Sequence, residues 1–257
     1  MMNVDEYLRR INYTGSLRVD AETLRNLQLA HLRNVPFENL SIHAGEPIVL
    51  NDEALFAKIV SIRRGGFCYE LNGLFSWLLR TLGFDVFMLA AGVANREDGY
   101  GPEFDHMALM VNLKQRWLAD VGFGDSFVEP LLLDEDGIQQ QGTQAFRIIP
   151  DDSHLIVMRR DTDQEWKPQY RFTLQTYNYA DYEEMCRFHQ KSPESHFTKS
   201  RICSRATLDG RITLSGLRLI TTSKQERDER ALRSEDEFES VLREQFGIVM
   251  NRTRAVN

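Results

Sequence analysis

The sequence has few cysteines, a deficit of positive charge and no long apolar run. Its three cysteines, Cys68, Cys186 and Cys203, form neither the even set of a disulfide framework nor a metal-binding spacing. The net charge of -7 argues against a nucleic-acid partner, because such proteins need a basic surface to displace counterions. No apolar run approaches the ~20 residues that span a bilayer, and residues 1–6 lack the character of a signal peptide. We therefore expect a cytoplasmic protein with no metal and no membrane partner.

Apolar residues are nevertheless plentiful. They make up 42% of the 257 residues, against 27% charged residues, which is enough to bury a large core in one domain or in a few packed subdomains. The apolar spacing is helical up to Gly83, alternates from Phe84 to about Leu174, and is mixed afterwards. This order of helices, then strands, then a mixed tail predicts an α+β fold.

The periodicity also predicts the individual elements. Helices are expected over residues 4–11, 20–32, 51–63, 68–82, 181–190 and 234–246, with Asp20 and Ser234 as N-terminal caps. Strands are expected over residues 85–93, 106–113, 116–123, 154–159, 170–174, 201–208 and 211–214. Between the last two strands, Asp209-Gly210 is suited to a type I′ turn.

Cys68 is the first candidate for chemistry. It follows Gly65-Gly66 and begins a predicted helix, on the same apolar stripe as Leu71 and Phe75. Unpaired amides and the helix dipole at this position favour a thiolate, and the same amides could stabilise an oxyanion. A buried cysteine on an apolar stripe is also an ordinary core residue, so the functional interpretation depends on partners.

Two partners are present. A thiolate used in acyl transfer needs an imidazole and a third group that orients it. His106 begins an apolar strand, and Asp120 lies inside another, where a carboxylate is costly to bury without a partner. Taken singly, they could be a satisfied core histidine and an aspartate bonded to nearby backbone amides.

The spacing of these two residues raises a geometric difficulty. If Lys114-Gln115 formed a two-residue turn, Asp120 would lie opposite Leu109 and point to the other face from His106, ~10 Å away. A Cys68–His106–Asp120 cluster therefore requires an irregular turn or a bulge in this hairpin, or a chain that curls at His106.

Three separated segments carry a family resemblance. They are Val-Pro-Phe-Glu-Asn-Leu at residues 35–40, Arg-Gly-Gly-Phe-Cys-Tyr-Glu-Leu-Asn at residues 64–72, and Asp-Val-Gly-Phe-Gly at residues 120–124. With His106 between the last two, the sequence resembles the arylamine N-acetyltransferase family. The resemblance is strong over residues 5–130; beyond that, only residues 192–198 and the overall length agree.

The resemblance implies a fold and a division of the chain. It implies a helical subdomain over residues 1–83 that carries the nucleophile, and a β-barrel-like subdomain over 84–190 that carries the histidine and aspartate. Residues 191–257 would form an α/β lid. The core would be like that of cysteine proteases and transglutaminases.

The resemblance also implies ping-pong chemistry with acetyl-CoA as co-substrate. Cys68, His106 and Asp120 would be catalytic, and arylamines, arylhydrazines and arylhydroxylamines would accept the acetyl group. Phe37 and Phe123 match positions that line the acceptor pocket, although ordinary core packing explains them equally well.

The resemblance also bears on residues outside this set. Glu38 and Arg64 match a structural ion pair in the family. No CoA-binding residues are identified, and Lys199, Arg201 and Arg205 could either meet phosphates or be plain surface.

Three other functions use or retain the same residues. A cysteine amidase or peptidase would result if water could reach the acyl-enzyme, and an amide synthase on polyketide-type chains would need a larger pocket. A non-catalytic binding protein is disfavoured because all three triad residue types are present. The oligomeric state is not indicated by the sequence.

Overall fold

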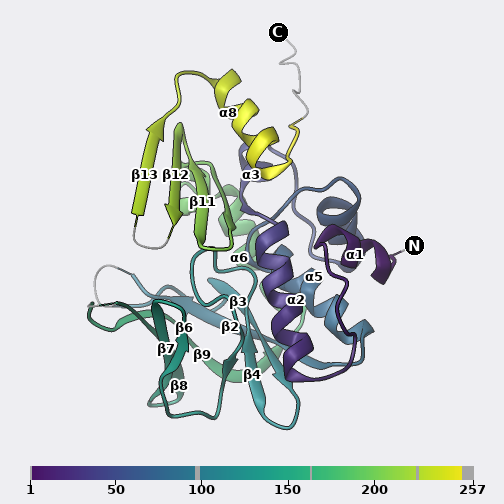
Figure 1. Cartoon of the computed structure of the whole chain (residues 1–257), viewed down its shortest axis with the longest axis vertical. Helices are drawn as coiled ribbons and strands as arrows, with labels where there is room; N and C mark the ends of the chain where they lie inside the picture. The colour runs from purple at the N-terminus through teal and green to yellow at the C-terminus, as the bar shows by residue number, and fades with distance from the viewer. Residues whose placement is uncertain (1, 96–98, 163, 224–225, 251–257) are drawn as a thin grey trace.

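The computed structural model describes residues 2–95, 99–162, 164–223 and 226–250. In Figure 1, α1, α2 and α5 lie together on one side, a large curved sheet lies below, and a smaller sheet with α8 lies above. Within the described residues, no helix is long and apolar enough to cross a membrane.

The helices begin where the sequence predicts caps. Asp20 accepts a hydrogen bond from the Thr23 amide at the start of α2, and Ser234 accepts one from the Glu237 amide at the start of α8. The helices are α1 (Val4–Arg10), α2 (Ala21–Asn34), α3 (Leu40–His43), α4 (Asp52–Phe56), α5 (Cys68–Thr81), α6 (Tyr179–Lys191), α7 (His196–Lys199) and α8 (Glu235–Val241). A π-helical turn extends α4 over Ala57–Ser61 and α8 over Leu242–Phe246.

The strands form two antiparallel sheets. The larger has the order β5-β4-β3-β2-β9-β8-β7-β6 and curves into a barrel-like shape, which confirms the predicted α+β class. Its strands are β2 (Asp85–Val93), β3 (His106–Asn112), β4 (Arg116–Ala119), β5 (Leu131–Leu132), β6 (Gln139–Gln141), β7 (Gln144–Asp151), β8 (His154–Asp161) and β9 (Lys167–Tyr177). The smaller has the order β1-β10-β11-β12-β13, from β1 (Phe37–Glu38), β10 (Ile202–Ala206), β11 (Gly210–Ser215), β12 (Arg218–Ser223) and β13 (Glu226–Ala231).

The predicted type I′ turn at Asp209-Gly210 is wrong. Neither residue has the positive φ that this turn requires, and the pairing Ala206↔Arg211 leaves a four-residue connection. Gly210 is needed for another reason, because a Cβ there would lie 2.1 Å from the carbonyl oxygen of Thr222 on β12. The glycine therefore allows close strand approach instead of a left-handed turn.

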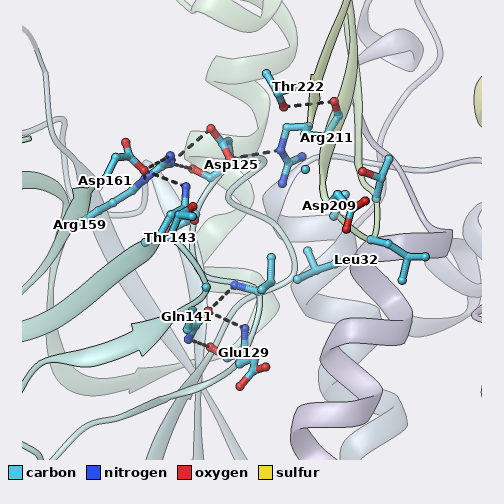
Figure 2. A pocket seen from close by; sticks show the side chains of 18 of the residues that line it. Leu32, Asp125, Glu129, Gln141, Thr143, Arg159, Asp161, Asp209, Arg211 and Thr222 are labelled. Atoms are coloured by element: carbon cyan, nitrogen blue, oxygen red, sulfur yellow. Dashed lines mark hydrogen bonds and ion pairs between the residues drawn. The ribbon is translucent and has the colours of Figure 1, made fainter. Parts of the chain in front are cut away.

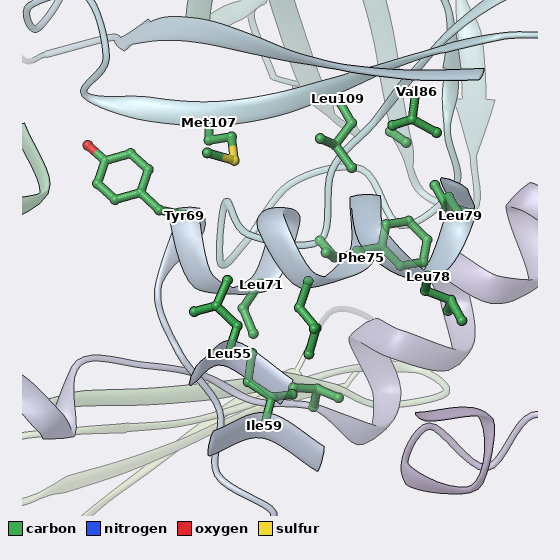
Figure 3. Close-up of a cluster of buried hydrophobic side chains, with 14 of the residues drawn as sticks. Leu55, Ile59, Tyr69, Leu71, Phe75, Leu78, Leu79, Val86, Met107 and Leu109 are labelled. Carbon is green, nitrogen blue, oxygen red and sulfur yellow. The ribbon is translucent and has the colours of Figure 1, made fainter. Parts of the chain in front are cut away.

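Three apolar cores stabilise these layers. The first surrounds α5, whose residues Leu71 and Phe75 pack between the helical segment, with Leu55, and the strands β2 and β3, with Leu109 (Figure 3). The second fills the barrel-like sheet, and the third lies between the smaller sheet and α8. Because the first core contains residues of both α5 and β3, the predicted subdomain boundary at residue 83 crosses a continuous core, and the division stays a prediction.

Candidate active site

Cys68 is the first residue of α5 and is almost completely buried. Glu70 fixes the start of the helix, because its carboxylate accepts a hydrogen bond from the Phe67 amide at 3.1 Å. The same carboxylate forms an ion pair with Lys58 at 2.7 Å. Gly66 has no room for a side chain, since a Cβ there would lie 2.7 Å from the Cβ of Glu70. Gly66 thus lets the chain pass close to the helix that presents the cysteine, while Gly65 lets it pass close to the carbonyl of Pro36.

His106 and Asp120 form a buried pair. The Nε2 of His106 lies 2.7 Å from the Oδ2 of Asp120, and both side chains are almost fully shielded from solvent. The hydroxyl of Tyr170 on β9 donates to the same Oδ2 at 3.1 Å, and the Gly122 amide donates to Oδ1 at 2.8 Å. Burial, followed by the Asp120 charge, raises the pKa of Tyr170 well above its usual value, so the phenol remains a donor.

The hairpin between β3 and β4 has the irregular turn that this pair requires. Asn112 pairs with Arg116, so the turn has three residues, and the Leu113 amide donates to the carbonyl of Gln115. The register Leu109↔Ala119, continued by one residue, places Asp120 on the same face as His106. Of the three possibilities left by the sequence, the irregular turn is the one observed.

Both segments of the hairpin contact the nucleophile. The backbone N–H of Met107, next to His106, lies near the thiol of Cys68 and acts to lower its pKa. On the other side, a Cβ on Gly122 would lie 2.7 Å from the Cα of Cys68. The structure therefore brings the three predicted catalytic residues into one buried cluster.

Two residues that the sequence did not single out, Asn72 and Tyr170, also belong to the cluster. Asn72, one turn after Cys68, donates from Nδ2 to the Met107 carbonyl at 2.6 Å and to Asp120 Oδ1 at 2.9 Å. Its spacing of four residues from Cys68 was a usable signal. Tyr170 lies 50 residues beyond Asp120 in the chain, and nothing in its local sequence points to the site.

The thiol of Cys68 is not activated by the helix start alone. Burial raises its pKa well above the usual value, although the Met107 N–H acts in the opposite direction. The expectation that the helix N-terminus lowers the pKa is therefore not met, because desolvation of the charged form outweighs the backbone donor. A thiolate at this position requires a group that takes the proton and remains beside it.

The two predicted pocket residues lie beside the cluster. The ring of Phe123 meets that of His106 edge-on, with centroids 5.2 Å apart. A Cβ added at Gly124 would lie 3.8 Å from the ring of Phe37, and the ring centroids of Phe37 and Phe197 on α7 are 6.2 Å apart. Both phenylalanines are half-buried, and their role as a pocket stays a prediction.

Glu38 and Arg64 form the buried ion pair that the resemblance implies. Arg64 Nε donates to Glu38 Oε1 at 3.0 Å, and the Leu40 amide donates to Glu38 Oε2 at 2.7 Å. Burial works to raise the pKa of Glu38, but the charges of Lys58 and Arg64 overcome it and lower the pKa. The pair joins the 35–40 segment to the nucleophile segment and fits a structural role.

The basic residues considered for CoA phosphates have protein partners. Arg201 forms two 2.8 Å hydrogen bonds to Glu235, and Arg205 donates to the carbonyls of Arg33 and Gln245. These contacts explain both arginines without a ligand. Among the described residues, the side chain of Lys199 has no hydrogen-bond or ion-pair partner.

A separate cavity of about 670 Å³ lies between α2, the barrel-like sheet and the β10–β11 connection (Figure 2). Its upper wall is held by Asp125, which pairs with Arg159 on β8 at 3.3 Å and Arg211 on β11 at 3.2 Å. None of the three predicted catalytic residues lines this cavity. Asp125 follows Phe123 by two residues, so these pairs anchor the loop that carries Phe123.

Comparisons with known proteins place this chain in a family. A family model described as N-acetyltransferase matches residues 20–255. The arylamine N-acetyltransferase pineal gland isozyme NAT-10 of Gallus gallus is 35% identical, over 98% of this chain and 96% of its own length. Proansamycin X synthase of Amycolatopsis mediterranei is 32% identical, over 94% and 96%. The solved structure of Mycobacterium marinum arylamine N-acetyltransferase in complex with CoA has a TM-score of 0.88 and 32% identity, and covers 96% of this chain and 93% of its own.

Proposed function

The chain belongs to the arylamine N-acetyltransferase family, and we propose that Cys68 carries the acetyl group between acetyl-CoA and an aromatic acceptor. The acceptors would be arylamines, arylhydrazines and arylhydroxylamines. The observation that carries this proposal is the buried cluster of Cys68, His106 and Asp120 at the N-terminus of α5. A cytoplasmic location accompanies the proposal as a prediction.

The first half-reaction loads the cysteine. Because His106 Nε2 faces Asp120, Nδ1 is the nitrogen that can take the thiol proton. The thiolate then attacks the acetyl carbonyl, the bond to the CoA sulfur breaks, and the departing sulfur receives the proton from His106. Asp120 stabilises the imidazolium that exists between these steps.

The second half-reaction transfers the acetyl group from Cys68 to the acceptor. The acceptor nitrogen, or the oxygen of an arylhydroxylamine, attacks the thioester carbonyl, and His106 takes the proton that the acceptor loses. The bond to Cys68 breaks, and the sulfur leaves as the thiolate. Phe37 and Phe123 offer aromatic faces beside the cluster, which suit a flat acceptor ring.

Intact mass measurement after incubation with acetyl-CoA alone tests the function. We expect the protein to gain one acetyl group, to lose it slowly in water, and to lose it fast when an aromatic amine is added, with the acetylated amine as product. Rapid loss to water without an amine product would instead identify the hydrolase alternative. Loading by long acyl thioesters but not by acetyl-CoA would identify the amide synthase alternative.

Alkylation by iodoacetamide tests the role of His106 in making the thiolate. We expect Cys68 to react near neutral pH at least ~10-fold faster than Cys186 or Cys203, because the proposed mechanism supplies a base, His106, to Cys68. Burial raises the pKa of Cys186 to about 12 and also raises that of Cys203. Peptide mass spectrometry gives the three rates. The advantage of Cys68 should disappear in His106→Gln; equal rates in the unmodified protein would contradict the mechanism.

A further inference from the structure

Asn72 is completely buried on α5, one helical turn after Cys68. Both polar atoms of its side-chain amide have hydrogen-bond partners. Nδ2 faces two acceptors, the Met107 carbonyl at 2.6 Å and Asp120 Oδ1 at 2.9 Å, while Oδ1 accepts from the Val121 amide at 2.9 Å. Because donors and acceptors are matched in only one way, the orientation of the amide is fixed.

We propose that Asn72 is a positioning residue for the acyl-transfer reaction, which holds the carboxylate of Asp120 against His106 from the same helix that carries Cys68. This inference rests on the proposed function. It assigns a role to a side chain that touches no substrate and acts through Asp120.

The contacts of Asp120 show how the positioning works. Oδ2 faces His106 and Tyr170, whereas Oδ1 faces Asn72 and the Gly122 amide. The two donors at Oδ1 fix the rotation of the carboxylate and thereby direct Oδ2 at His106. Donors of this kind also stabilise the ionised form of the carboxylate.

A second contact of Asn72 reaches the other side of the cluster. Its bond to the Met107 carbonyl fixes the residue whose own N–H acts to lower the pKa of the Cys68 thiol. One amide therefore ties the start of β3, the loop after β4 and the nucleophile helix together. The titratable groups that face Asp120 in this cluster are His106, Tyr170 and Cys68. A titratable side chain at position 72 would therefore act directly on Asp120 and its catalytic partners.

Asn72→Asp is the informative substitution, because it keeps the shape and the acceptor for Val121 but replaces the donor. Two carboxyl groups this close would share one proton, which still supplies a donor to Asp120 Oδ1. As the pH rises and this proton is lost, the two charges repel and Asp120 moves away from His106. The rate of acetyl-cysteine formation relative to the unmodified protein should therefore fall with rising pH, by about 10-fold per pH unit above the shared titration.

Asn72→Ala separates positioning from titration. It removes the donor without adding a charge, so its rate should be about 10- to 100-fold low at every pH, the loss typical of removing a partner behind a functional side chain. Asn39→Asp is the matched control for burying a carboxylate. Asn39 is buried to the same degree. Its Nδ2 donates to the backbone carbonyls of Phe197 and Ser200 and lies 3.4 Å from His43 Nε2, and among the described residues no carboxylate bonds to its side chain.

The measurement is acetyl-cysteine formation from acetyl-CoA by quenched intact mass across the neutral and mildly alkaline range, with thermal melting of each variant. A pH-dependent loss confined to Asn72→Asp supports the proposal. The same profile shape in Asn72→Asp and the unmodified protein would overturn it, as would an equal pH-dependent loss in Asn39→Asp. If the unmodified protein forms no acetyl-cysteine, the proposed function itself has failed, which is a different result.

Discussion

Replacing Cys68 by alanine is expected to abolish acetyl loading and acetyl transfer. The proposed reaction passes through a bond to the sulfur of Cys68. The hydroxyl of Tyr170 in the same cluster is held as a donor to Asp120, with its pKa raised by burial, and does not replace that sulfur. Removing a nucleophile of this kind lowers turnover by roughly 10⁶-fold. Intact mass after incubation with acetyl-CoA and product assay with an aromatic amine would both read zero.

The other two cysteines provide matched controls. Cys186 and Cys203 are also buried, and within the described part of the chain neither bonds to the His106–Asp120 pair. Cys186→Ala and Cys203→Ala should therefore keep the acetyl loading of the unmodified protein, apart from a loss of stability. Loading that persists in Cys68→Ala, or that disappears in Cys186→Ala while the protein stays folded, would show that another residue carries the acetyl group.

The sequence predicted the catalytic cluster better than it predicted how the cluster closes. Cys68, His106 and Asp120 could be named from residue type, apolar surroundings and order. His106 and Asp120 share a face only if the turn has three residues and not two. The residues from Leu113 to Gln115 are compatible with either length. A shift of one residue reverses the face, and composition does not specify it.

Two of the strands that the sequence did not predict, β6 and β13, share a physical cause. In β13 every residue is exposed, and in β6 no residue is buried, so neither strand shows the alternation that marks a half-buried strand. They form because neighbouring strands β12 and β7 offer backbone partners. By contrast, β2 and β3 are buried on both faces and rich in apolar residues, and their predicted bounds agree with the structure to within one residue.

Tertiary contacts also account for the residues that sequence reasoning missed. Tyr170 reaches Asp120 because β9 pairs with β2, which pairs with β3, a relationship that no local motif contains. The pKa of Cys68 is a similar case. The helix start is local and visible, whereas the burial that raises the pKa arises from packing against β3 and the 121–122 loop.

Replacing Asp120 by asparagine is expected to cost about 10⁴-fold in the rate of acetyl loading, the loss measured for the same change in serine proteases. The contacts explain why. Oδ1 of Asp120 faces only donors, Asn72 Nδ2 and the Gly122 amide, so the new amide must place its oxygen there and its NH₂ toward His106. Nε2 of His106 would then have to accept, which moves its proton to Nδ1 and leaves no site for the thiol proton.

Asp105→Asn is the matched control for this change. Asp105 precedes His106 directly and lies 3.3 Å from His189, but in the described contacts it does not bond to His106. Removing its charge, which acts to raise the pKa of Cys68, should change the loading rate by less than about 10-fold, the scale of one charge acting at a distance. Iodoacetamide should also label Cys68 slowly in Asp120→Asn, since the thiolate cannot form. An Asp120→Asn rate within 10-fold of the unmodified protein, or an equal fall in Asp105→Asn, would show that the tautomer of His106 does not control the reaction.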